Sequence, residues 1–291
     1  MGLPYRLSQR FPNIHSILYT FISLFFISIR NKEAWKNYAL SNLKKNKRHK
    51  KLFLILGSGE SINKISDDFW SWASKNTTTI AVGDWWYHDF VPDIYTTECE
   101  DHKQEARYKS WLYQINKKKE AYSNTIFLPK TYKKKDLINN MALGDEYSDL
   151  LKQFRYPDWY KAPAGSVLTF KFFCSKIFSK IKLLGINYIP SLRSNIVFAS
   201  FLAKELGAEK VILVGVDGFG GYFYNKYLSE DELKMRPELI RKIQRGSDEK
   251  HGLPTIPQIM KYLNQYIIPV NYLGKSLLEG YIQKFEYKKQ N

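Results

Sequence analysis

Cysteine is scarce in this chain of 291 residues, which contains only Cys99 and Cys174. Two cysteines make neither a disulfide framework nor a zinc site. A reducing compartment therefore fits the composition best. Cys174 follows two phenylalanines in an apolar stretch and is expected in the core.

Acidic residues are also few, with 28 Asp and Glu against 45 Lys and Arg, which leaves a formal net charge of +17. Such an excess indicates an anionic partner, which can be a nucleic acid, an anionic membrane face or a phosphorylated substrate. No recognised nucleic-acid-binding signature accompanies the charge. We therefore expect no nucleic-acid partner.

The sequence lacks a long run of purely apolar residues, but residues 11–29 carry no Asp, Glu, Lys or Arg. A spanning helix needs roughly 20 apolar residues, so this segment is borderline. The basic run 44–51 follows it, and an apolar helix with a polybasic stretch is a two-signal membrane anchor. Residues 1–50 are thus expected to be a helical extension that holds the protein at the cytoplasmic face of the inner membrane. The alternative is a helix docked on the protein itself or on another subunit.

Residues 51–291 read as an α/β domain, because short apolar runs bounded by glycine alternate with helical patterns. Such alternation predicts a parallel sheet with helices on both faces. The long charged stretch 219–251 is expected to be a lid. The predicted strands are residues 51–56, 78–83, 92–97, 210–217 and 268–272, and the predicted helices are residues 194–206 and 257–266.

The first candidate site is the turn Gly57-Ser58-Gly59-Glu60-Ser61, directly after the first predicted strand. Glycines allow a sharp turn and a close approach of the backbone to a phosphate, and a following helix would offer free N–H groups. The full dinucleotide fingerprint would need glycine at position 62, which is Ile62. The turn therefore predicts a nucleotide site without the dinucleotide signature, or else a simple strand-to-helix turn.

The second candidate site follows the strongest predicted strand, where Asp217 precedes a glycine-rich stretch that leads to Tyr222 and Tyr224. Ligands of open parallel sheets bind beyond the carboxyl ends of strands, and tyrosine hydroxyls can donate to a departing phosphate. Asp217 can equally be a turn or cap residue. His251 is a third candidate, since a histidine near its ordinary pKa can take a proton from a sugar hydroxyl; the alternative is an exposed loop residue.

A region rich in acidic residues and histidine follows the second and third predicted strands. A metal site is conceivable there, but the spacing matches no established ligand pattern. No metal is therefore expected. The residues are Asp84, His88, Asp89, Glu98, Glu100, Asp101 and His102.

Three stretches resemble the bacterial sialyltransferases of glycosyltransferase family 42, the Campylobacter lipooligosaccharide type. The turn 57–61 matches that family's Gly-Asn-Gly-Pro-Ser after its first strand. Residues 194–195 with the block 206–217 match the longest family block, and the segment 251–263 matches the one that bears the catalytic histidine. The resemblance implies a Rossmann-like domain with a mobile lid and a CMP-activated donor.

Carried onto this chain, the resemblance implies His251 as general base and Tyr222 or Tyr224 as the group that holds the leaving phosphate. It also implies that Ser194 and Asn195 face the donor's carboxylate. The implied nucleotide contacts are Gly57, Ser58, Gly59, Ser61, Asp84, Glu98 and Asp217.

Several positions depart from the family pattern. Glu60 replaces a proline, and Asp84 and Glu98 replace asparagines. Ionised carboxylates only accept hydrogen bonds, so the contact with the nucleotide must change. The donor can accordingly be CMP-Kdo or another nucleotide sugar.

The sequence thus predicts a metal-independent glycosyltransferase of bacterial surface polysaccharide synthesis. It would move a sialic acid or similar nonulosonic acid from a CMP-sugar to a glycan or glycolipid acceptor, without a further cofactor. A homo-oligomer is compatible with this reading. The alternative in kind is a pterin-type pyrophosphokinase, in which Asp84, Glu98 and Asp217 would hold Mg²⁺.

Overall fold

The computed structural model describes most of residues 49–287. The described residues are 49–96, 113–128, 194–218, 221–230 and 255–287, with the backbone of 160–162 and 188–190.

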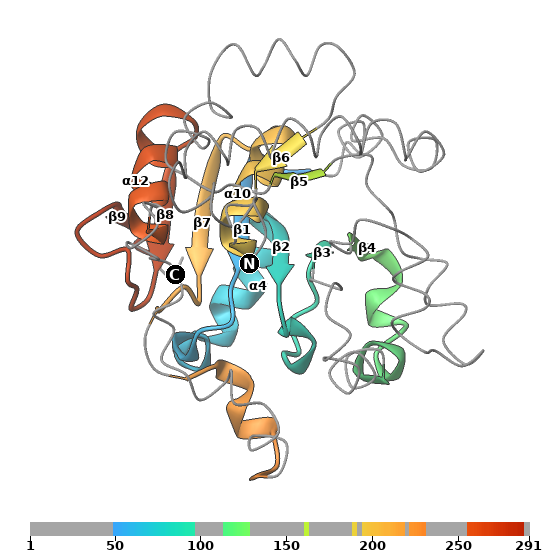
Figure 1. Cartoon of the computed structure of the whole chain (residues 1–291). Helices are drawn as coiled ribbons and strands as arrows, with labels where there is room; N and C mark the ends of the chain where they lie inside the picture. The colour runs from blue at the N-terminus through green and yellow to red at the C-terminus, as the bar shows by residue number, and fades with distance from the viewer. Residues whose placement is uncertain are drawn as a thin grey trace, which may run out of the picture.

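Seven parallel strands form the central sheet, in the order β4-β3-β2-β1-β7-β8-β9 (Figure 1). β1 lies inside the sheet between β2 and β7. A separate pair of parallel strands, β5 and β6, accompanies it. The strands are β1 (Leu52–Leu56), β2 (Thr78–Val82), β3 (Ile94–Thr96), β4 (Ile126–Phe127), β5 (Tyr160–Ala162), β6 (Tyr188–Pro190), β7 (Lys210–Val214), β8 (Val270–Leu273) and β9 (Gln283–Lys284).

Three α-helices and four short 3-10 helices lie among the described strands, and residues 113–117 are also helical. The α-helices are α4 (Asp67–Asn76), α10 (Asn195–Glu205) and α12 (Ile256–Tyr266). The 3-10 helices are η2 (Glu60–Lys64), η3 (Trp85–Tyr87), η5 (Ala121–Asn124) and η7 (Phe223–Tyr227).

Each face of the sheet has its own apolar core, because successive side chains of a strand point to opposite faces. Phe53 and Ile55 of β1 pack with α10 and α12. Leu54 and Leu56 of the same strand pack with α4 and with the aromatic residues of η3 and η7. This double burial explains why β1 is a continuous apolar run, and it confirms the predicted α/β, Rossmann-like fold with helices on both faces.

The predicted strands and helices between residues 51 and 272 are confirmed, with bounds that differ by a few residues. The sequence analysis missed α4, whose only buried residues are Phe69, Trp70 and Ala73 among polar ones. It also missed β9, which is two residues long and exposed. A short or mostly polar element carries too few apolar residues to produce a recognisable period.

None of the helices in the described ranges is long and apolar enough to cross a membrane. The segment 11–29 and most of the extension 1–50 lie outside the described residues, as does most of the predicted lid 219–251. Within that lid, residues 221–230 are described and contain η7.

The strand order creates a switch point between β1 and β7. From β1 the chain continues to β2, β3 and β4 on one side, and later returns to β7, β8 and β9 on the other. The connections that follow β1 and β7 therefore lead to strands in opposite halves of the sheet. Ligands of open α/β sheets bind in the crevice at such a point.

Candidate functional site at the switch point

The loops after β1 and β7 touch through their backbones at the switch point. The N–H of Gly57 donates to the carbonyl of Val214 at 2.7 Å, and that of Gly59 to the carbonyl of Gly215 at 2.8 Å. A Cβ on Gly57 would lie 2.4 Å from the carbonyl oxygen of Gly215, which leaves no room for a side chain. Close approach of the two loops thus explains the first glycine of the turn.

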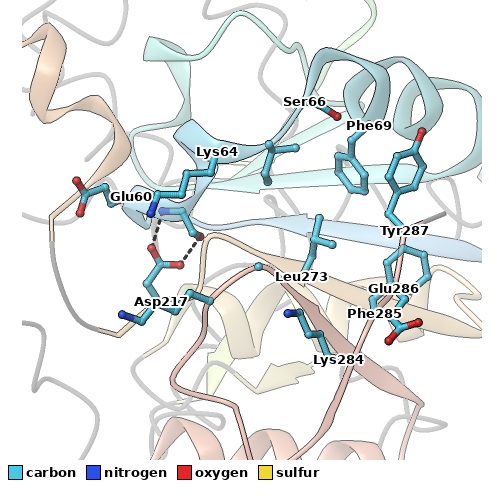
Figure 2. Close-up of a pocket in the computed structure, with 14 residues that line it drawn as sticks. Glu60, Lys64, Ser66, Phe69, Asp217, Leu273, Lys284, Phe285, Glu286 and Tyr287 are labelled. Atoms are coloured by element: carbon cyan, nitrogen blue, oxygen red, sulfur yellow. Dashed lines mark hydrogen bonds between the residues drawn. The ribbon is translucent and has the colours of Figure 1, made fainter. Parts of the chain in front are cut away.

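Asp217 braces this contact from the β7 side. Its carboxylate accepts the Ser61 N–H at 2.7 Å and the Ser61 hydroxyl at 2.5 Å (Figure 2). The side chain is 4% exposed, and burial raises the pKa of its carboxyl while the two bonds from Ser61 act against that rise. A Cβ on Gly59 would lie 2.4 Å from the Asp217 Cγ, so the second glycine makes room for the carboxylate.

Most N–H groups of the turn are consequently satisfied by the chain itself. Those of Gly57 and Gly59 bond the β7 loop, that of Glu60 donates to Gly221 at 3.2 Å, and that of Ser61 donates to Asp217. The helix that follows the turn is η2, a 3-10 helix of only five residues. Within the predicted phosphate cradle of Gly57, Ser58, Gly59 and Ser61, the donors of all residues but Ser58 are therefore already in use.

Ser58 is the member of the turn that remains available. Within the described ranges, neither its N–H nor its hydroxyl takes part in a hydrogen bond. The residue is half-buried, and its carbonyl accepts the N–H of Phe223 at 3.1 Å. Ser58 thus presents two donors at the switch point.

The loop after β2 closes one side of Ser58. Gly83 has φ +71°, a conformation that favours glycine, and a Cβ on it would lie 3.2 Å from the Ser58 hydroxyl oxygen. Asp84 follows Gly83 and is 2% exposed, at the start of η3. The structure therefore brings Ser58 and the predicted Asp84 to neighbouring loops of the same sheet edge.

The segment 222–224 closes the other side. Tyr222 pairs with Gly59 through a short antiparallel bridge. Its ring is half-buried and stacks on Tyr224 with 5.1 Å between centroids. Tyr224 is 2% exposed and also stacks on Tyr87 at 5.5 Å. Tyr222 is the more exposed of the two tyrosines predicted to hold a phosphate, and Tyr224 belongs to the core.

Ser194 and Asn195 begin α10. The Ser194 hydroxyl accepts the N–H of Val197 at 3.4 Å and caps the helix. The far end of α10 leads to Glu209, whose N–H bonds Lys51 at the amino end of β1. A helix of eleven residues is about 16 Å long, similar to a five-residue strand, so its first residues lie toward the carboxyl edge of the sheet.

Two predicted site residues, His251 and Glu98, lie outside the described residues. The expected placement of His251 across the cleft from the glycine turn therefore stays a prediction. The same holds for a nucleotide contact by Glu98.

His88, from the region in which a metal site was conceivable, serves packing. Its Nδ1 accepts the N–H of Phe90 at 2.9 Å, and its ring stacks on Trp85 at 4.6 Å between centroids. Burial lowers the pKa of His88 to about 4. In the described ranges no group of three His, Cys, Asp or Glu side chains is arranged to hold a metal ion.

A cavity of about 780 Å³ lies beside the turn, on the side of β8 and β9 (Figure 2). Ser61 and Asp217 are the two predicted site residues among its lining. The sequence analysis did not identify this cavity, because the final segment 285–287 that forms part of its wall carries no motif.

The sequence matches no known protein family and no curated protein. Among solved structures, the chain is similar to the Campylobacter sialyltransferase CST-II, a variant of which was solved in complex with CMP. The identity is 15%, the match covers 80% of this chain and 85% of that chain, and the TM-score is 0.42.

Proposed function

We propose that the protein is a nucleotide-sugar glycosyltransferase whose donor phosphate binds at Ser58. The observation that carries this proposal is the pair of donors on Ser58 that no described residue uses, placed in the loop after β1 at the switch point between β1 and β7. Donors fixed in advance at a developing phosphate charge stabilise a leaving nucleotide. The excess of positive charge in the chain suits an anionic donor.

The proposed donor is a CMP-activated sialic acid or similar nonulosonic acid, as the sequence resemblance implies. The acceptor is a glycan or glycolipid of bacterial surface polysaccharide, and the extension 1–50 holds the enzyme at the cytoplasmic face of the inner membrane. These assignments are supported by the sequence motifs and by the basic run 44–51.

In the proposed reaction, the His251 imidazole takes the proton of an acceptor hydroxyl. The acceptor oxygen bonds to the anomeric carbon while the bond from that carbon to the phosphate oxygen breaks. CMP leaves with the electron pair, and the imidazolium returns its proton to solvent. Ser58 and Tyr222 meet the phosphate as its charge develops.

A thermal-shift series with CMP, CDP, UDP, GDP and ATP, with and without EDTA, tests this function. A ligand of the folded state raises the melting temperature by mass action, so CMP and CDP should raise it and EDTA should leave the shift unchanged. A shift produced only by ATP, and abolished by EDTA, would instead favour the pyrophosphokinase. Each oxygen of Asp217 already accepts one hydrogen bond from Ser61, which reduces what the carboxylate can offer to a Mg²⁺ ion.

His251→Ala separates the chemistry from binding. The variant should keep the shift produced by CMP and lose donor turnover by about 100-fold or more, because positioned general bases contribute about that much. Full turnover in His251→Ala with the donor that wild type uses would remove His251 from the mechanism.

A further inference from the structure

The cavity beside the turn has two sides (Figure 2). η2 and the start of α4 form one side, and the β8–β9 edge with the segment 285–287 forms the other. Its volume, about 780 Å³, falls within the roughly 300–1,000 Å³ of small-molecule sites. Ser58 is not among its lining residues. A ligand in this cavity would therefore lie beside the proposed phosphate position and not in it.

One wall of the cavity is aromatic. Phe69 of α4 and Tyr287 meet edge to face, with 5.3 Å between ring centroids. Trp72 lies behind them, 5.5 Å from Tyr287 and 5.9 Å from Phe285. Phe285 and Tyr287 are half-buried, so part of each ring stays open. Mutual packing fixes these rings before any ligand arrives, which lowers the entropic cost of binding.

The remaining lining is charged but balanced. It contains three lysines, Lys64, Lys275 and Lys284, and three acids, Glu60, Asp217 and Glu286. Within the described part of the chain, the side chains of Lys64, Lys284 and Glu60 take part in no hydrogen bond or ion pair.

This balance selects the class of ligand. The phosphates of a nucleotide would gain no net attraction here, because the three acids of the lining offset its three lysines. A polyhydroxylated ligand instead donates to carboxylates and accepts from ammonium groups, since each hydroxyl does both. The C–H face of a pyranose ring is apolar and fits an aromatic wall.

We propose that this cavity binds a saccharide unit of the acceptor that carries no large net charge. Its role as an acceptor site rests on the proposed transferase function. Ser61 joins the two sites, because it lines the cavity and belongs to the same turn as Ser58. A saccharide unit bound in this cavity, away from the reacting hydroxyl, would contribute to selecting and orienting the acceptor.

A printed array of defined neutral and acidic oligosaccharides tests this inference, with the strongest saccharide then titrated in solution. Wild type should bind neutral oligosaccharides, and Lys64→Glu should weaken the binding by about tenfold or more, the effect of losing a charge-assisted hydrogen bond. The matched control is Lys261→Glu on α12, an exposed lysine on the opposite face of the sheet, which should bind as wild type does. Tyr287→Ala probes the aromatic wall as a second variant.

The inference fails if wild type binds no oligosaccharide, if Lys64→Glu binds like wild type, or if polyanionic oligosaccharides bind best. The CMP thermal shift, measured on the same preparations, separates this failure from that of the proposed function. A CMP shift without saccharide binding would remove only the saccharide site. Saccharide binding lost in Lys64→Glu, without any nucleotide shift, would keep the site and remove its role as an acceptor site.

Discussion

Two polar residues of the switch point, Ser58 and Asp217, have different tasks. Sequence motifs mark both as nucleotide contacts. Each carboxylate oxygen of Asp217 accepts a hydrogen bond from Ser61, whereas no described residue accepts one from the N–H or hydroxyl of Ser58. The distinction depends on a contact between residues 156 positions apart, which no local pattern contains. The sequence could therefore nominate both residues, but it could not predict that the Asp217 carboxylate bonds Ser61.

Asp217→Ala should destabilise the fold by about 1–3 kcal/mol, because it leaves the Ser61 N–H without its acceptor in a half-buried loop. Ser61→Ala removes only the hydroxyl bond and should cost about 0.5–1.5 kcal/mol. Urea denaturation of both variants gives these free energies of unfolding. A free energy of unfolding for Asp217→Ala within about 0.5 kcal/mol of wild type would contradict the stabilising role of the Asp217–Ser61 hydrogen bonds.

His88 should make the stability pH-dependent below neutrality. Burial lowers its pKa from 6.5 to about 4, so the unfolded chain takes up a proton at a higher pH than the folded protein does. This contribution is therefore complete above about pH 6.5 and is lost as the pH falls toward 4. Between about pH 7.5 and pH 5 the loss should be about 2 kcal/mol.

The variant His88→Asn isolates that contribution, since an amide oxygen can replace Nδ1 as acceptor for the Phe90 N–H without titrating. Urea denaturation at the two pH values should show a smaller loss for His88→Asn than for wild type. Equal losses in the two proteins would show that folding does not lower the pKa of His88.

At the scale of elements, the sequence was informative where a strand is buried on both faces. β1 and β7 are continuous apolar runs, and both were predicted close to their observed bounds. The aromatic contact of α4 with the segment 285–287 was not predictable, because those partners are more than two hundred residues apart and neither has a strong period of its own. Tertiary packing, and not the local preference for a helix or strand, determines the conformation of both α4 and the segment 285–287.

A double-mutant cycle tests the contact between α4 and the final segment. Trp72→Ala and Tyr287→Ala should be coupled by about 0.5–1.5 kcal/mol, since their rings lie 5.5 Å apart. The control pair is Trp72→Ala with Tyr266→Ala, because Tyr266 is exposed on α12 across the sheet. That pair should be additive within about 0.5 kcal/mol. Additivity in both cycles would mean that the final segment does not pack on α4 in solution.

At the scale of the whole molecule, the strand order matters more than any single motif. It places the loops after β1, β2 and β7 at one edge of the sheet, and these loops carry Ser58, Asp84 and Asp217. Sheets of this kind serve many chemistries, so the fold alone does not determine the function. The functional argument therefore rests on which groups at that edge remain free for a ligand.

The most direct test of the account is the affinity for CMP, measured by isothermal titration calorimetry in wild type, Ser58→Ala and Ser71→Ala. Ser58→Ala should bind CMP about tenfold or more weakly, because it loses a hydrogen bond to a charged phosphate. Ser71→Ala, on the exposed surface of α4, should bind as wild type does. Equal affinity in all three proteins, or no binding by wild type, would contradict a phosphate site at Ser58.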